Sequence, residues 1–265
     1  MIFDETIAYT IDGNLDGATV VFIHGWPDNA TVWRHQVAAL GGKYRCVLMT
    51  LPNFGEEAEH PGGYNFPTLV ELLARTIEDL RRKDERVILI THDWGAYLGY
   101  FYEQLYPNRI LKMVALDIGG HVKPSTAKEV LFMVGYQWTL IVCWLVGGVT
   151  PTLGNWLTRK FANALGVPAR QANSVRSRCN YLYFFLWRGM LLPWARKALL
   201  NYYRPQSPIL FMYGGRKPVM FHSDRWLEIV DQAGGRTECI EEAGHWLMES
   251  HPERVNDAIT KWLTA

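Results

Sequence analysis

An aspartate follows an apolar run in the stretch RVILITHDWGAYLGY, residues 86–100. Arg86–Ile90 is typical of a buried strand, and a helical pattern begins shortly after Asp93. Thr91 and Gly95, two small residues, lie two positions before and two positions after the aspartate. Small residues at this spacing let a strand turn sharply into a helix and expose the middle side chain at the end of the sheet. Asp93 could simply cap the helix, but we favour a nucleophile that forms a covalent ester.

Two other segments could complete a site around this aspartate. His24–Asp28, with the sequence HGWPD, follows an earlier strand-like run, and its glycine permits a close approach of the backbone. The backbone N–H groups of Trp26 and Trp94 are therefore predicted to form an oxyanion hole. His245 stands on a loop before the last helical pattern, where an imidazole could activate water near neutral pH. The alternative for His245 is a solvated loop histidine.

These residues need a sheet that brings strand ends together. Five apolar runs alternate with helical patterns and are predicted strands: Ala18–His24, Arg45–Thr50, Arg86–Ile90, Leu111–Asp117 and Ile209–Tyr213. Such alternation predicts an α/β fold with a mostly parallel sheet flanked by helices. Catalytic groups in such sheets gather beyond the carboxyl ends of the strands.

The alternation stops between about Gly119 and Arg204, where the pattern indicates helices without strands. We interpret this segment as a helical lid over the active end of the sheet. The segment Val130–Thr158 contains no charged residue and is long enough to span a bilayer. It includes polar residues, a Gly-Gly pair and a proline, so an apolar lid is favoured. A lid that also touches a membrane surface is the less favoured alternative.

The combination HGWPD, HDWG and GH, in this order along nearly the whole chain, resembles the α/β-hydrolase fold superfamily. It is most similar to the epoxide hydrolase and haloalkane dehalogenase branches, which use an aspartate nucleophile. The resemblance implies a core of residues 1–120 and 205–265, and an all-helical cap of residues 121–204 inserted after the strand that ends near Asp117. It also implies a cofactor-independent enzyme without a metal.

Epoxide hydrolases supply two lid tyrosines that protonate the opened ring. One lies in a stretch ending Tyr-Gln, which Gly135–Trp138 resembles, and the other in a Trp/Tyr-Tyr-Arg stretch, which Asn201–Arg204 resembles. The resemblance thus makes Tyr136 and Tyr203 the candidate acids, with aromatic core packing as the alternative for each. The predicted substrate-binding residues are Trp94, Gln137 and Trp138.

The acid that should orient His245 is missing from its usual position. The family usually places it after the strand within PILFMYGGRKPVMF, and there the chain has Lys217. The superfamily's other location follows the strand after the nucleophile, which here ends in Asp117. We predict that Asp117 orients His245, although it could instead cap the start of the lid. Asp224 and Glu242 are outside candidates.

Three functions stay open, and the leading one is an epoxide hydrolase acting on a hydrophobic epoxide, with water as co-substrate. A haloalkane dehalogenase would keep Trp94 as one halide donor and would need a second, from Trp138, Trp144 or Trp187. The third is a ligand-binding relative without catalysis, which Lys217 would explain. A lipid carboxylesterase at a membrane surface is a weaker idea, because Asp93 is a poor nucleophile for that reaction.

Composition narrows the remaining choices. The net charge of +1 argues against general binding to nucleic acid or acidic membranes. The four cysteines lie far apart and match no metal-ligand spacing. They are expected to be reduced, and no secretory signal is visible, so we expect a cytoplasmic protein that is a monomer or a homodimer.

Overall fold

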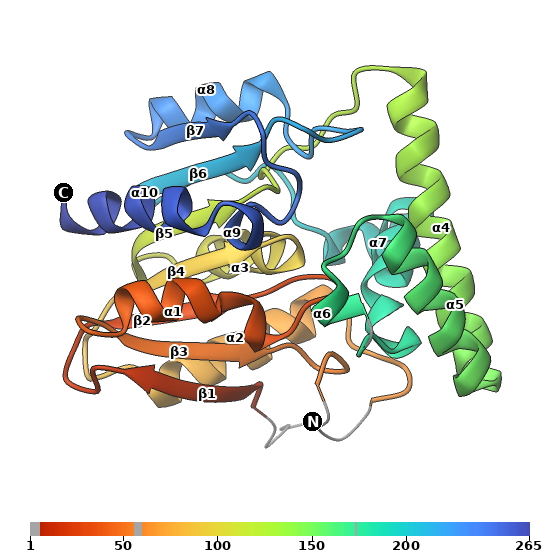
Figure 1. Cartoon of the computed structure of the whole chain (residues 1–265), viewed down its shortest axis with the longest axis horizontal. Coiled ribbons are helices and arrows are strands. Elements are labelled where there is room, and N and C mark those ends of the chain that lie inside the picture. The colour runs from red at the N-terminus through yellow and green to blue at the C-terminus, as the bar shows by residue number, and fades with distance from the viewer. Residues whose placement is uncertain (1–5, 56–59, 173) are drawn as a thin grey trace.

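A seven-stranded sheet forms the centre of the molecule in the computed structural model, which describes residues 6–55, 60–172 and 174–265 (Figure 1). The strand order is β1-β3-β2-β4-β5-β6-β7, with β1 antiparallel to β3 and every other pair parallel. The strands are β1 (Ala8–Gly13), β2 (Thr19–Ile23), β3 (Arg45–Thr50), β4 (Val87–His92), β5 (Ile110–Leu116), β6 (Ile209–Gly214) and β7 (Arg236–Ile240). The predicted fold class and the five predicted strands are confirmed.

The edge strand β1 was not predicted. All six of its residues are exposed or half-buried, so it shows no apolar run. In contrast, every residue of β2 and of β4 is buried, because helices cover both faces of the sheet centre.

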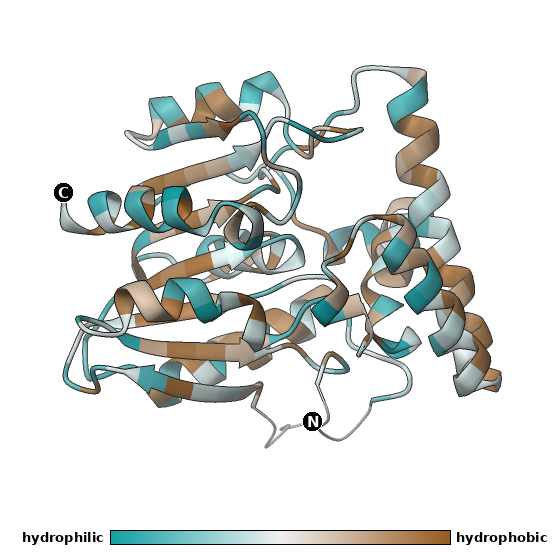
Figure 2. Ribbon diagram, viewed as in Figure 1, coloured by the Kyte–Doolittle hydropathy of each residue, from teal (hydrophilic) through white to brown (hydrophobic). Residues whose placement is uncertain are grey.

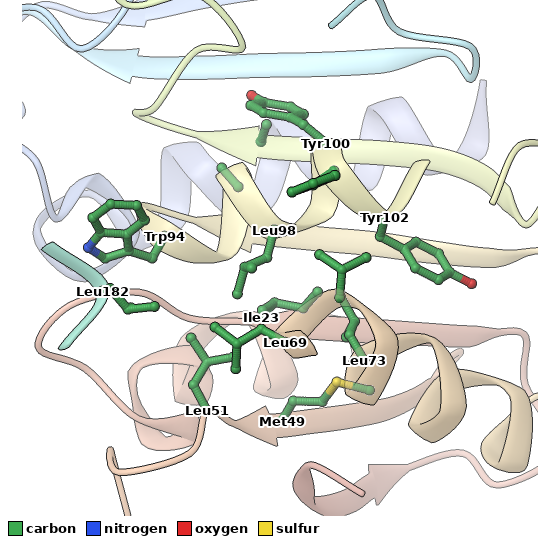
Figure 3. Packing of buried hydrophobic residues seen from close by; sticks show 14 of the residues in the cluster. Ile23, Met49, Leu51, Leu69, Leu73, Trp94, Leu98, Tyr100, Tyr102 and Leu182 are labelled. Atoms are coloured by element: carbon green, nitrogen blue, oxygen red, sulfur yellow. The ribbon is translucent and has the colours of Figure 1, made fainter. Parts of the chain in front are cut away.

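Helices on the two faces pack into two separate hydrophobic cores. The first core holds buried side chains of α2 (Phe66–Leu80), α3 (Trp94–Leu105) and α8 (Asp224–Gln232). Figure 3 shows part of this core, with Leu69 and Leu73 of α2 close to Leu98 of α3. The second core holds side chains of α1 (Arg34–Leu40), α9 (Leu247–Ser250) and α10 (Pro252–Thr264). Alternate residues of β2 enter each core, since successive strand side chains point to opposite faces.

All described elements between β5 and β6 are helical. They are α4 (Ala127–Val149), α5 (Pro151–Ala164), α6 (Ala169–Ala172) and α7 (Tyr181–Leu191), with short 3-10 segments at Ser177–Asn180 and Pro193–Ala198. We call residues 121–204 the helical insertion. It lies beyond the carboxyl ends of the strands, with α4 at its outer edge (Figure 1).

The uncharged stretch Val130–Thr158 forms two helices rather than one. Pro151 lies in the first turn of α5, where its missing N–H costs nothing, but it cannot continue α4. By length and composition α4 alone could cross a membrane, with a mean hydropathy of 1.8, and only 28% of its apolar window is buried within the protein.

Candidate active site

Asp93 occupies the sharp turn between β4 and α3. Its backbone has φ 53° and ψ −123°, a conformation that non-glycine residues adopt only under strain. The turn fits because its neighbours are small: a Cβ on Gly25 would lie 2.3 Å from Asp93 Oδ1, and one on Gly95 would lie 2.1 Å from the carbonyl oxygen of Ile23. Thr91, two residues before the aspartate, is fully buried, and its hydroxyl donates to the carbonyl of Val114 at 3.2 Å. A residue larger than glycine is therefore accommodated there.

The two carboxylate oxygens of Asp93 have different partners. The backbone N–H of Trp26 donates to Oδ1 at 2.6 Å, and the backbone N–H of Trp94 lies near the same carboxylate and helps to lower its pKa. Oδ2 lies 3.5 Å from Nε2 of His245. The two predicted oxyanion-hole donors thus converge on Asp93, while one oxygen faces the imidazole.

His245 is held from its other side by Asp117. Its Nδ1 donates to Asp117 Oδ2 at 2.5 Å. Asp117 is fully buried directly after β5, and its Oδ1 accepts from the backbone N–H of Gly214 at 3.1 Å and from the ammonium of Lys217. The structure therefore places Asp117 where the predicted orienting acid would have to lie. Its role in turnover stays a prediction.

The two outside candidates for this acid lie elsewhere. Asp224 is the first residue of α8, and Glu242 is largely exposed, 3.8 Å from Arg254. Lys217 occupies the position where the family usually has the orienting acid. In this structure it forms an ion pair with Asp117, the acid that follows β5.

At Asp93, Asp117 and His245, pairing with an opposite charge shifts the pKa more than burial does. Burial alone would raise the pKa of Asp93, but the hydrogen bond and positive charge of His245 hold this pKa below its usual value. Burial would likewise raise the pKa of Asp117, whereas Lys217 and His245 lower it to about 2. Burial would lower the pKa of His245, but Asp117 and Asp93 raise it to about 9. Both carboxylates are thus charged at neutral pH, and the imidazole is protonated while Asp93 carries its charge.

Replacing Lys217 with methionine should raise the pKa of His245 above its present value of about 9. The ammonium offsets part of the charge of Asp117, so without it the carboxylate stabilises the imidazolium more strongly. Nuclear magnetic resonance titration of the His245 ring would measure the shift, with the exposed Lys83→Met as a control that should leave the titration unchanged. An unchanged or lowered pKa in Lys217→Met would contradict this prediction.

Two cavities reach Asp93 from different sides. One of about 510 Å³ extends past His245 and Trp246, and another of about 410 Å³ extends between residues 118–124, α4 and α7. Asp93, Tyr136, Tyr183 and Phe221 line both cavities, and most of the other lining residues are apolar. An apolar substrate could therefore lie against the carboxylate.

Tyr136 and Tyr183 line both cavities and lie beside each other. Their rings meet edge to face with centroids 5.9 Å apart, and Gln137 Nε2 donates to the hydroxyl of Tyr136 at 3.1 Å. Burial raises the pKa of both hydroxyls far above neutral pH, and the negative charge of Asp93 adds to the effect. Both hydroxyls therefore keep a proton that they can donate toward the cavity.

Sequence reasoning missed Tyr183, which lines both cavities, and the structure places the predicted Tyr203 away from them. Tyr203 is almost fully buried and does not line either cavity. Its hydroxyl donates to Glu103, and its ring stacks on Tyr100 with centroids 4.7 Å apart. Glu103 also accepts from the backbone N–H of Ser207 at 2.8 Å. Tyr203 thus belongs to a buried hydrogen-bonded cluster around Glu103 that fixes the segment just before β6.

Of the three predicted substrate-binding residues, two line a cavity and one does not. Trp94 and Gln137 line the second cavity, and Gln137 Oε1 accepts from the indole N–H of Trp187 at 2.9 Å. Trp138 does not line either cavity: its side chain is 42% exposed and packs against Trp187. Because helix residues two apart point in nearly opposite directions, Trp138 cannot face inward with Tyr136.

Comparison with known proteins gives a matching family and several relatives. The model of the family described as "Alpha/beta hydrolase family" matches residues 20–258. Epoxide hydrolase 1 of Caenorhabditis elegans is 24% identical over 278 residues, covering 96% of this chain and 67% of that protein. A haloalkane dehalogenase of Mesorhizobium japonicum is 28% identical over 116 residues, covering 44% of this chain and 37% of that protein. Among solved structures, Bacillus megaterium epoxide hydrolase in complex with an inhibitor superposes with a TM-score of 0.71 at 20% identity, over 98% of this chain and 97% of the other.

Proposed function

The chain belongs to the α/β hydrolase family, and we propose that it acts there as an epoxide hydrolase that converts a hydrophobic epoxide into a vicinal diol. Several relatives named as epoxide hydrolases support this activity. The observation that carries the proposal is the placement of Asp93: its carboxylate faces His245, and it shares two cavities with the hydroxyl-bearing Tyr136 and Tyr183.

The first half-reaction would form an ester. Oδ2 of Asp93 attacks one epoxide carbon, and the bond between that carbon and the ring oxygen breaks. Tyr136 or Tyr183 donates a proton to the oxygen as it becomes an alkoxide. Oδ1 becomes the ester carbonyl oxygen and stays with the backbone N–H groups of Trp26 and Trp94.

The second half-reaction would hydrolyse that ester. Esterification removes the charge of Asp93, which lowers the pKa of His245 and lets the imidazole release its proton to solvent. His245 Nε2 then takes a proton from water, whose oxygen attacks Cγ of Asp93, and the N–H groups of Trp26 and Trp94 stabilise the oxyanion. The Cγ–Oδ2 bond breaks, and the diol leaves with Oδ2 and the proton from His245. The second proton of the water restores the tyrosine, and His245 regains a proton from solvent once Asp93 is again charged.

The direct test is to incubate the protein separately with styrene oxide and with a bromoalkane, and to measure diol and halide. We expect diol from the epoxide and no halide above the level of an Asp93→Ala control. Halide release without diol would overturn the proposal in favour of a dehalogenase. Failure to release either product across a panel of epoxides and haloalkanes would favour a ligand-binding relative without catalysis.

One observation favours the dehalogenase as second candidate. The buried indole N–H of Trp94 lines the second cavity beside the hydroxyl of Tyr183, so it could bind a halide. A released halide needs a second donor, but the other cavity-lining indoles are engaged. Trp26 donates to Asn180, Trp187 to Gln137 and Trp246 to Asp28. Two tyrosine hydroxyls fit an epoxide oxygen better.

A further inference from the structure

Charge is distributed very unevenly between the helical insertion and the rest of the chain. Residues 121–204 contain eleven Lys and Arg but a single acidic residue, Glu129, which gives a net charge of +10. The remaining residues contain 16 Lys and Arg against 25 Asp and Glu, a net charge of −9. The overall charge of +1 therefore conceals a strongly basic insertion attached to an acidic core.

The same insertion exposes an apolar stripe. Five apolar residues of α4 recur at helical spacing and are all exposed: Leu131, Trp138, Val142, Leu145 and Val149. Their spacing places them on one side of the helix, and the exposed fractions of Leu131 and Val149 reach 74% and 87%. Leu153 and Trp156 of α5, which packs beside α4, are also exposed. Figure 2 shows these apolar stretches along the outer edge of the molecule.

Basic side chains border this stripe. Lys128 lies about one turn before Leu131 on α4, and Lys160 lies about one turn after Trp156 on α5; both are exposed, as is Lys123 just before α4. Tryptophan and aliphatic residues flanked by lysines are typical of helices that lie in the interface of a bilayer. We propose that this face, α4 and α5 with the flanking lysines, docks on an anionic phospholipid bilayer without crossing it.

Charge identifies the bilayer as the occupant. Anionic lipid attracts the basic insertion and repels the acidic core, so the molecule would be oriented with the insertion toward the membrane. A second copy of this chain would instead bring two strongly basic faces together, which is unfavourable. Crossing the membrane does not fit either, because β5 and β6 flank the insertion and pair in one sheet.

The second cavity gives this orientation a consequence for the substrate, which rests on the proposed function. Val122, Val130 and Met190 line that cavity and are themselves 40%, 46% and 51% exposed. Its wall thus includes exposed apolar residues of the insertion as well as Asp93. A lipophilic epoxide dissolved in the bilayer could reach the carboxylate through this cavity without crossing water.

The test is cosedimentation of the full chain with vesicles of phosphatidylcholine alone and of phosphatidylcholine mixed with phosphatidylglycerol. We expect binding to the mixed vesicles that weakens with added salt, and much weaker binding to the neutral ones. Lys123→Glu/Lys128→Glu/Lys160→Glu should bind the mixed vesicles at least roughly a hundredfold more weakly, since each basic residue near the surface contributes about fivefold. Leu131→Ser/Leu145→Ser/Val149→Ser should also bind weakly, through loss of the apolar contact.

Matched controls come from the acidic core, where Lys83→Glu and Leu15→Ser alter exposed residues and should leave vesicle binding unchanged. Diol formation from a water-soluble epoxide without vesicles should be normal in all these variants, and Asp93→Asn should still bind vesicles. Docking and catalysis can therefore fail independently. Absence of vesicle binding, equal binding to both vesicles, or equal loss in the controls would overturn the proposal. The proposal would also be overturned if the wild-type protein formed a dimer in solution and did not bind vesicles, and if Leu131→Ser/Leu145→Ser/Val149→Ser dissociated that dimer.

Discussion

Replacing His245 with glutamine should stop the reaction halfway and leave the substrate covalently attached to Asp93. The first half-reaction needs only the carboxylate and the tyrosine hydroxyls, whereas hydrolysis needs the imidazole to take a proton from water. Turnover should fall at least about a thousandfold, within the usual range for loss of a general base. The intact protein should gain the mass of one substrate molecule when analysed by mass spectrometry.

The control for this trap removes the attacking group. His245→Gln combined with Asp93→Ala should gain no mass, and peptide mapping of His245→Gln should place the adduct within the segment that contains Asp93. Diol formation by His245→Gln at the wild-type rate would show that water is activated elsewhere. Steady slow turnover without an adduct would show that the first half-reaction also depends on the imidazole.

The placement of Asp93, His245 and Asp117 could be predicted because the fold's topology dictates it. Each follows directly on, or shortly after, a parallel strand, and the carboxyl ends of parallel strands meet at one edge of the sheet. Strand-like apolar runs are visible in the sequence, so residues at their ends can be placed without side-chain detail. Because Lys217 occupies the family's usual position for the orienting acid, the sequence indicated that Asp117 takes this role. Only the structure shows that Lys217 and Asp117 form an ion pair.

Residues of the helical insertion could not be placed in this way. Which face of a helix meets the core depends on how the helices pack over the sheet, and an aromatic run such as Tyr181–Trp187 shows no polar side to indicate it. Tyr183 was therefore hidden among its neighbours. The sequence around Tyr203 matched a family pattern. Its hydroxyl instead donates to Glu103, which is 100 residues away in the sequence, so no sequence pattern indicated this hydrogen bond.

The membrane alternative illustrates a different limit. The overall charge argued against acidic membranes, because it averages a basic insertion with an acidic core. Counted separately, residues 121–204 carry a net charge of +10, so the overall charge gives no argument against membrane contact by this segment. The hydropathy of α4 alone could not separate a buried helix from an exposed one; the exposure of one stripe, seen only in the folded protein, makes that distinction.

Changing both Tyr136 and Tyr183 to phenylalanine should reduce kcat/KM at least about a thousandfold, and each single change should reduce it about ten- to a hundredfold. Ring opening creates an alkoxide in an apolar cavity, where it is costly unless a hydroxyl protonates it. Either tyrosine alone would supply one donor, so the loss of the second should be the more severe. Phenylalanine preserves the shape of both buried rings, so thermal unfolding should change little. Pre-steady-state measurement of ester formation on Asp93 would show that the defect lies in the first half-reaction.

Tyr203→Phe provides the matched control, because sequence similarity pointed to this residue and the structure places it away from Asp93. Its kcat/KM should stay within a few-fold of the wild-type value. Its free energy of unfolding should fall by about 1–3 kcal/mol, since the buried Glu103 loses a donor. The opposite outcome, a large kinetic loss in Tyr203→Phe and none in Tyr183→Phe, would mean that the insertion rearranges when substrate binds. In that event Tyr203 rather than Tyr183 would be the partner of Tyr136.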